Sequence, residues 1–237
     1  RTDFKDKILV PFCPESELSG VGYTDFIAAV WYHRTVTVSA EQLQGKVYLH
    51  FGAVDYDCRV FVNGTEAGRH KGGYVSFALE ISALLNEGEN HLVVCAQDDT
   101  RSPMQPIGKQ SDRFYSHDCS YTRTTGIWQT VWLEPVASSH ITSIKAIPNI
   151  DNGVMSVTVG ACSDSPVSDI VEVSLLDKGQ VVATAKGVQG TELRLAVQNP
   201  TLWEPSNPYL YDMKVSLSKN GKKVDEVKSY TAFRKIS

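Results

Sequence analysis

The stretch from Gln97 to Gly126 concentrates side chains that could bind hydroxyl groups or a carboxylate. The candidate groups in it are Asp98, Asp99, Arg101, Lys109, Arg113, His117, Asp118, Tyr121 and Arg123. Arginine is suited to binding a carboxylate through two parallel hydrogen bonds. The stretch is long for a connection inside a compact domain, and such loops are usually functional or disordered. We therefore interpret it as a candidate binding loop.

Close pairs of carboxylates are the other sequence feature that suggests chemistry, because they can serve acid–base catalysis. Asp55 and Asp57 would share one face of a strand, and Asp98 and Asp99 are adjacent. We interpret these acids as partners of turn amides or of a neighbouring arginine. The sequence contains no Ser-His-Asp constellation, phosphate-binding glycine loop or histidine-rich metal spacing. We predict no catalytic, cofactor-binding or metal-binding residue.

Length and charge exclude several classes of function. The 237 residues suffice for two ordinary domains, and a hydrophobic fraction of 42% is that of a globular protein. A formal net charge of -4 offers no basic stripe for nucleic acid. No apolar run approaches the ~20 residues that span a bilayer. The chain opens at Arg1 without a Met or an apolar leader, so we expect a trimmed segment of a periplasmic or secreted protein, with the cytoplasm as the alternative.

The cysteines are odd in number and have no CxxC spacing: Cys13, Cys58, Cys95, Cys119 and Cys162. A fully paired disulfide framework and a zinc pattern are therefore excluded. We expect free thiols packed as small hydrophobic groups, with one bridge between Cys13 and Cys119 as the alternative.

Apolar and polar residues alternate along most of the chain, which predicts β-strands. The aligned sets include Val47, Leu49 and Phe51; Val60 and Val62; Met155, Val157 and Val159; Val171, Val173 and Leu175; Leu193, Leu195 and Val197; and Met213, Val215 and Leu217. Asn63-Gly64, Lys178-Gly179 and Asn220-Gly221 are reversal signals between such runs. The one helical candidate, residues 81–85, is a single turn. The pattern predicts an all-β protein built of sandwiches.

The segment from Tyr121 to Glu134 joins the polar loop to one of these strands. Its alternation places Ile127, Gln129, Val131 and Leu133 on one face and Trp128, Thr130, Trp132 and Glu134 on the other. Such a strand would present Tyr121 and Arg123. The tryptophans occupy strand-like or proline-flanked settings, so we expect core or domain-interface packing for Trp31, Trp128, Trp132 and Trp203.

A domain boundary is predicted near residues 135–139. Long loops and aromatic residues precede it, and about 100 residues of plain alternation follow, the size of an immunoglobulin-like sandwich. The predicted domains are therefore residues 1–137 and residues 138–237.

Several blocks together resemble glycoside hydrolase family 2. Tyr-Thr-Arg-Thr-Thr-Gly-Ile-Trp-Gln-Thr-Val-Trp-Leu-Glu, from residue 121 to residue 134, is similar to a signature of its sugar-binding domain. Further similar blocks, in the expected order, are Trp31 to Arg34, Phe51 to Tyr56, Val60 to Gly64, Gly68 to Phe77, Gly88 to Val94, Pro200 to Trp203, Pro208 to Tyr211 and Phe233 to Ile236. The resemblance covers nearly the whole chain.

The resemblance implies a jelly-roll sugar-binding domain, an immunoglobulin-like sandwich and a catalytic TIM barrel after Ser237. Family members such as β-galactosidases and β-glucuronidases are retaining exo-glycosidases, which use two carboxyl groups about 5–5.5 Å apart. In the family both are glutamates at barrel strand ends, the acid/base following an Asn. This chain has one Asn-Glu pair, Asn86-Glu87, but it lies in a glycine-flanked turn and not at the end of a barrel strand. We therefore predict that this chain alone is inactive.

The resemblance also points to contacts between the polar loop and a substrate. Family β-galactosidases reach the sugar with an acid at the position of Ser120, so the acid here is displaced to Asp118 or absent. We predict substrate contacts for Asp118, Arg123 and Tyr121, and more weakly for Glu15. The alternative is a loop salt bridge that packs the jelly roll against the barrel.

Three functions remain open from the sequence. The first is the non-catalytic N-terminal part of a family 2 exo-glycosidase, with a carbohydrate substrate, the catalytic barrel and a possible second copy as partners. The second is a free-standing carbohydrate-binding module, and the third is an adhesion or structural β-sandwich.

Overall fold

The computed structural model describes residues 4–163 and 169–236, and it is all-β, as predicted. The chain separates into two compact units, Arg1–Pro135 (unit 1) and Val136–Ser237 (unit 2), close to the boundary expected from the sequence. Within the described ranges the helical elements are single 3-10 turns: η1 (Glu17–Ser19), η2 (Gln42–Gln44) and η3 (Ser82–Leu84). No helix in the part of the chain that the structure describes is long and apolar enough to cross a membrane.

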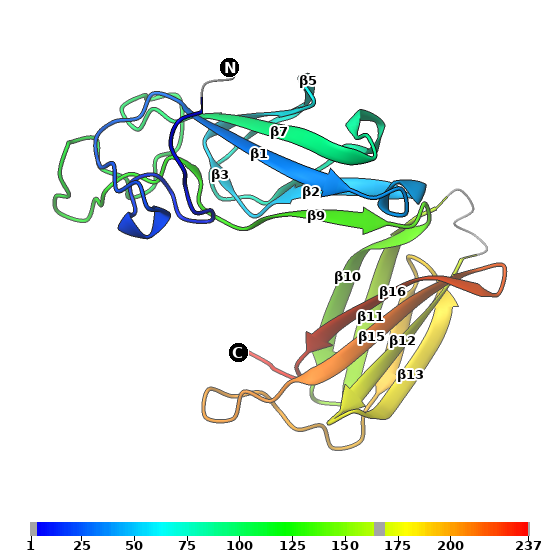
Figure 1. Cartoon of the computed structure of the whole chain (residues 1–237). Coiled ribbons are helices and arrows are strands. Elements are labelled where there is room, and N and C mark those ends of the chain that lie inside the picture. Colours follow the sequence, from blue (N-terminus) through cyan, green and yellow to red (C-terminus); the bar gives the residue numbers. More distant parts are fainter. Residues whose placement is uncertain (1–3, 164–168, 237) are drawn as a thin grey trace. The chain divides into compact units, whose positions relative to one another are not determined.

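Unit 1 is a β-sandwich whose strands are labelled in Figure 1 where there is room. Its strands are β1 (Val30–Val38), β2 (Lys46–Phe51), β3 (Val54–Asp55), β4 (Asp57–Val62), β5 (Thr65–Lys71), β6 (Phe77–Glu80), β7 (Gly88–Gln97), β8 (Gly126–Ile127) and β9 (Val131–Val136). The main sheets have the orders β1-β7-β4-β5 and β6-β2-β9, and β3 pairs with β8.

The core of unit 1 follows from strand alternation. In β2 every second residue is buried, so Val47, Leu49 and Phe51 face inward. In β4 the buried residues include Val60 and Val62, and all five belong to one apolar cluster with residues of the other strands. Fully burying a side chain of this size contributes roughly 1.5–3 kcal/mol. The two main sheets are therefore held face to face by the residues that the sequence pattern selects.

Unit 2 is a second antiparallel sandwich. Its strands are β10 (His140–Asn149), β11 (Val154–Cys162), β12 (Ile170–Asp177), β13 (Gln180–Val188), β14 (Glu192–Ala196), β15 (Tyr211–Lys219) and β16 (Lys222–Thr231). They form sheets of order β10-β11-β14 and β13-β12-β15-β16, and alternate residues of both sheets meet in one core. Three strands facing four is the arrangement of an immunoglobulin-like sandwich, which confirms the predicted fold class.

Three of the predicted reversals are two-residue hairpins. Asn63-Gly64 joins β4 to β5, Lys178-Gly179 joins β12 to β13, and Asn220-Gly221 joins β15 to β16. All six residues have φ between 49° and 85°. Such turns need positive φ at both positions, which Asn and Gly tolerate at little cost. The helical candidate at residues 81–85 is the 3-10 turn η3.

Core packing is wrong for two of the tryptophans, and domain-interface packing stays a prediction for them. Trp31 is 37% exposed and Trp132 is 44% exposed, so neither lies in a core. Trp132 points outward from β9 and stacks on the imidazole of His50, with ring centroids 4.7 Å apart. Trp31 stacks in the same way on Phe61 across the outer face of its sheet. An indole can be covered on one face by a neighbouring strand without entering the core.

Cys13 and Cys119 are both described and do not form a disulfide, so the alternative bridge between them is absent. Cys58 and Cys95 are buried, as expected for small hydrophobic groups, whereas Cys119 is exposed.

Candidate functional site

The long loops of unit 1 meet beside the short β3–β8 pair. One is the N-terminal loop, residues 9–29, and the other is the β7–β8 loop, residues 98–125, drawn in blue and green in Figure 1. The backbone N–H of Thr125 donates to both carboxylate oxygens of Glu15, at 3.2 Å each. Arg123 donates to the carbonyl oxygen of Thr24. The two loops are therefore joined by direct polar contacts.

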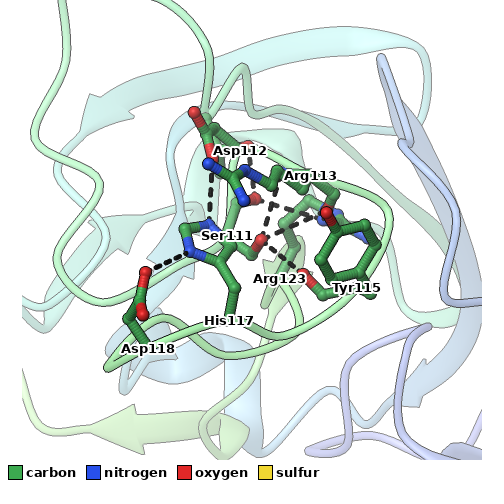
Figure 2. Close-up of polar contacts among 8 residues, drawn as sticks. Ser111, Asp112, Arg113, Tyr115, His117, Asp118 and Arg123 are labelled. Atoms are coloured by element: carbon green, nitrogen blue, oxygen red, sulfur yellow. Dashed lines mark hydrogen bonds and ion pairs between the residues drawn. The ribbon is translucent and has the colours of Figure 1, made fainter.

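The β7–β8 loop is folded on itself by its own backbone. The N–H of Ser111 donates to the carbonyl of Tyr121 at 2.7 Å, and the N–H of Tyr121 donates to the carbonyl of Lys109 at 2.7 Å. His117 and Ser120 exchange two further backbone hydrogen bonds. The hydroxyl of Ser111 donates to the carbonyl of Tyr115 and accepts from the N–H of Arg113 (Figure 2). A loop with this many internal hydrogen bonds can hold side chains in place.

Arg123 fastens the folded loop to the rest of unit 1. Its side chain is buried, with the residue only 3% exposed. Nη1 donates to the carbonyl oxygens of Ser111, at 3.1 Å, and of Arg113, and Nη2 donates to Thr24. Figure 2 draws the bonds of the guanidinium to Ser111 and Arg113 as dashed lines. Arg123 is therefore not presented at the surface as expected from the sequence, although a substrate contact through it stays a prediction.

An aromatic ring supports the same guanidinium. Phe26, from the N-terminal loop, has the Arg123 guanidinium carbon 4.1 Å from its ring centroid, and that of Arg101 at the same distance. Phe114 packs edge-on against Phe26, with centroids 5.1 Å apart. Cation–π contacts of this kind are worth most where the cation is desolvated, as it is at Arg123.

His117 is held between two acids at the tip of the loop. Its Nδ1 lies 3.2 Å from Oδ2 of Asp118, and its Nε2 lies 3.2 Å from Oδ1 of Asp112 (Figure 2). Both contacts are hydrogen bonds only when both ring nitrogens carry a proton. The Asp118 side chain is 88% exposed, and its backbone adopts a positive φ of 48°. Asp118 thus combines a contact with His117 inside the loop with an open carboxylate, and its contact with a substrate stays a prediction.

The other two predicted site residues have opposite environments. Tyr121 is 60% exposed, so its ring and hydroxyl are available to a ligand. Glu15 is 6% exposed, and its carboxylate accepts from Thr125. Tyr121, Asp118 and Arg123 belong to one loop, whereas Glu15 lies beneath it. Substrate binding by Tyr121 and Glu15 stays a prediction.

Two buried carboxyl groups lie under the β7–β8 loop, and sequence reasoning did not pair them. Asp55, at the end of β3, is 2% exposed, and Asp98, which follows β7, is 7% exposed. Nε2 of Gln110 donates to Oδ2 of Asp55 at 2.9 Å, and Nε2 of Gln105 donates to Oδ1 of Asp98. The signal that could have found them is that each acid directly follows or ends an apolar strand run.

The environment of both carboxyl groups favours their neutral form. Burial raises the pKa of Asp55 to about 7, and the Asp98 carboxylate adds to the rise. Burial raises the pKa of Asp98 to about 6, with Glu15 adding to the rise and the bond from Gln105 opposing it. Desolvation and the neighbouring negative charges both raise the pKa of these carboxyl groups.

The expectation that Asp55 and Asp57 share one face of a strand is wrong. Asp57 begins the next strand, β4, and binds Arg69, with Nε to Oδ1 at 2.8 Å, and Lys71. These partners lower the pKa of Asp57, mainly through the hydrogen bond from Arg69. The neighbouring-arginine interpretation is confirmed for Asp57, whereas Asp55 belongs to the buried group around Asp98.

Gly73 closes the space around Asp55. A Cβ added to Gly73 would approach the Asp55 carboxylate more closely than real Cβ atoms approach any heavy atom. The carbonyl of Gly73 accepts from Nε1 of Trp128 at 2.8 Å. The glycine is thus required by a close approach of backbone to carboxylate, and Trp128 fixes that backbone.

No group of three or more His, Cys, Asp or Glu side chains in the described ranges is arranged to hold a metal ion. Glu87 lies in the connection between η3 and β7, where the side chain of Asn90 binds the backbone of Asn86. This agrees with the interpretation of Asn86-Glu87 as a turn.

Both units match models of known protein families. The sugar-binding domain of glycosyl hydrolases family 2 matches residues 22–135, and a second domain of glycosyl hydrolases family 2 matches residues 139–234. The chain belongs to glycosyl hydrolases family 2.

The relatives of this family 2 chain are much longer than it is. A protein named putative beta-glucuronidase from Formosa agariphila is 27% identical over 214 residues, covering 86% of this chain and 25% of the relative. A beta-galactosidase from Thermoanaerobacter pseudethanolicus is 26% identical, covering 90% of this chain and 29% of the relative. The crystal structure of a putative beta-galactosidase from Bacteroides fragilis has a TM-score of 0.71 at 27% identity and covers 89% of this chain and 33% of that one. The chain therefore spans about a quarter to a third of the proteins it matches.

Proposed function

We propose that this chain is the non-catalytic N-terminal part of a retaining family 2 exo-glycosidase that acts on a β-glucuronide or a β-galactoside. The match of both units to the family, over only a quarter to a third of its relatives, carries the proposal. In it, the catalytic barrel is a C-terminal partner outside residues 1–237, and the enzyme is periplasmic or secreted. A second copy of the enzyme is a further possible partner.

The state of the carboxyl groups supports a non-catalytic role. Retaining hydrolysis needs a nucleophile and an acid/base about 5–5.5 Å apart, on either side of a bound sugar. Asp55 and Asp98 are buried, each has one oxygen bound to a loop glutamine, and Gly73 packs against Asp55. Neither carboxyl group is therefore open to a substrate.

The exposed side of the β7–β8 loop supports a place at the edge of the active site. Asp118 and Tyr121 are open to solvent on a loop that Arg123 fastens from below. A carboxylate that accepts from sugar hydroxyls and a ring that stacks on a sugar are common elements of carbohydrate recognition. We propose that they contact the substrate once the barrel completes the site.

The alternative is a free-standing carbohydrate-binding module, favoured by the exposed rings of Tyr74, Tyr115 and Tyr121. An NMR titration of the ¹⁵N-labelled chain with glucuronic acid, galactose and their methyl β-glycosides separates the two. An edge loop without its barrel has too few contacts for binding, so we expect no saturation below roughly 10 mM.

Saturable shifts with Kd below roughly 1 mM, centred on residues 118–123 and lost in Tyr121→Ala, would replace our proposal with the module. Tyr230→Ala is the matched control, because Tyr230 is a similarly exposed tyrosine of unit 2, at 69% against 60%.

A further inference from the structure

The β7–β8 loop is attached to unit 1 through two buried carboxyl groups. Asp55 ends β3, and Asp98 is the first residue of the loop directly after β7, so strand ends of the sandwich place both carboxyl groups. Gln110 and Gln105, which bind them, belong to the loop. The amide oxygen of Gln110 accepts from the backbone N–H of Thr124 at 2.7 Å, so the middle of the loop and its C-terminal end are linked to the same acid.

Each carboxyl group keeps one oxygen without a partner. Oδ1 of Asp55 and Oδ2 of Asp98 are buried and accept no hydrogen bond within the described part of the chain, so the two groups are not bonded to each other. A buried ionised carboxylate with an unsatisfied oxygen is unfavourable, and two of them in mutual range are worse. Adding a proton to one of them removes the repulsion while keeping the other oxygen free to accept from its glutamine.

The charges facing this pair are mostly negative. Asp55 faces Asp98 and Glu15, and its charge is also felt by the phenol of Tyr74. Asp98 faces Glu15 and Asp99, with Arg123 as an opposing positive charge. The three hydrogen bonds of Arg123 go to backbone carbonyls of Thr24, Ser111 and Arg113 rather than to either acid. Arg123 therefore relieves only part of the repulsion.

We propose that Asp55 and Asp98 form a proton-dependent latch, which holds the β7–β8 loop on the sandwich most tightly while both are protonated and loosens as they ionise. The proposal concerns the loop of this chain and does not depend on the enzyme to which the chain belongs.

The direction of the pH response follows from the shifts. Both folded-state pKa values, about 7 for Asp55 and about 6 for Asp98, lie above the ordinary 3.8. A group with a raised pKa stabilises the closed loop fully below its ordinary value, and this contribution is lost as the pH rises to the raised value. The latch therefore weakens between about pH 4 and pH 7 and changes little above that range.

Hydrogen exchange measured by mass spectrometry on the purified chain tests the latch. Labelling times are scaled to the intrinsic exchange rate at pH 5, 6, 7 and 8, and protection is compared for peptides within residues 98–125. We expect protection of these peptides to fall at least about tenfold from pH 5 to pH 7 and then to level off. Peptides from β12 and β15 of unit 2 serve as the internal reference.

Variants assign the response to the two acids. Asp55→Asn and Asp98→Asn each remove one titrating group, and we expect either to reduce the decrease of protection by at least about threefold relative to the wild type. Asp57→Asn is the matched control, because Asp57 lies two residues from Asp55 but pairs with surface cations, and it should keep the wild-type response.

Two results would overturn the latch: loop protection in the wild type that is independent of pH, or an undiminished response in both asparagine variants. If a variant does not fold, ¹³C NMR titration of the wild-type aspartate carboxyl groups decides instead. The latch requires two carboxyl groups that titrate near pH 6–7 and loop amide resonances that shift over the same pH range. The absence of either result contradicts the latch.

Discussion

Replacing Arg123 with alanine is expected to lower the free energy of unfolding of unit 1 by about 3 kcal/mol. The reason is that the carbonyl oxygens of Thr24, Ser111 and Arg113 lose a charged donor at once, two of them inside one loop. Hydrogen bonds to charged groups contribute about 1.5–3 kcal/mol each, and buried acceptors left without a partner are costly. Urea denaturation of the wild type and the variant, followed by tryptophan fluorescence, measures the difference.

Arg101→Ala is the matched control for this prediction. Arg101 places its guanidinium carbon as close to the Phe26 ring as Arg123 does, but its side chain is 59% exposed. An exposed cation–π contact is worth about 0.5–1 kcal/mol, so this variant should lose no more than that. Equal losses in the two variants would show that stacking on Phe26, and not the carbonyl contacts, is the function of Arg123. Arg123→Lys should fall between them, because an ammonium cannot reproduce the planar fork.

Replacing Gly73 with alanine is expected to cost about 2–3 kcal/mol, because the new methyl group would overlap the Asp55 carboxylate. The backbone at residue 73 cannot retreat freely, since its carbonyl holds the indole of Trp128. In an Asp55→Ala background the obstacle is absent, so adding Gly73→Ala should then cost less than about 1 kcal/mol.

A double-mutant cycle in urea measures this coupling, which should reach about 1.5 kcal/mol or more. Additive losses would mean that the glycine is required for another reason. Gly68→Ala is the control, because its Cβ would meet the Leu79 side chain and not Asp55, so it should show no coupling to Asp55→Ala.

The sequence predicts the sandwiches well because strand alternation and hairpin dipeptides are local signals. Leu49 and Val60 are buried as expected, and Asn63-Gly64 adopts the positive φ values that such a turn needs. The exposed positions of Trp31 and Trp132 could not be predicted in this way, because their rings stack on residues from other strands, Phe61 of β4 and His50 of β2.

The candidate site is harder to predict because it depends on contacts between distant segments. Asp55 and Asp98 are each close to another acid in the sequence, which suggested local pairs. In the fold, however, the charge of Asp98 acts on Asp55, whereas Asp57 binds Arg69. Arg123 was expected to be presented by the strand that follows it. Its burial follows from carbonyl groups that the loop turns inward, a feature with no sequence pattern.

The central claim, that this chain belongs to a glycosidase but does not itself hydrolyse glycosides, is tested most directly by assaying the purified chain with 4-nitrophenyl β-glucuronide and β-galactoside. A family 2 β-glucuronidase and a family 2 β-galactosidase serve as positive controls. We predict release of nitrophenol at the rate of buffer alone. Turnover by the wild-type chain that is abolished by Glu87→Gln, or by Asp55→Asn, would contradict the account.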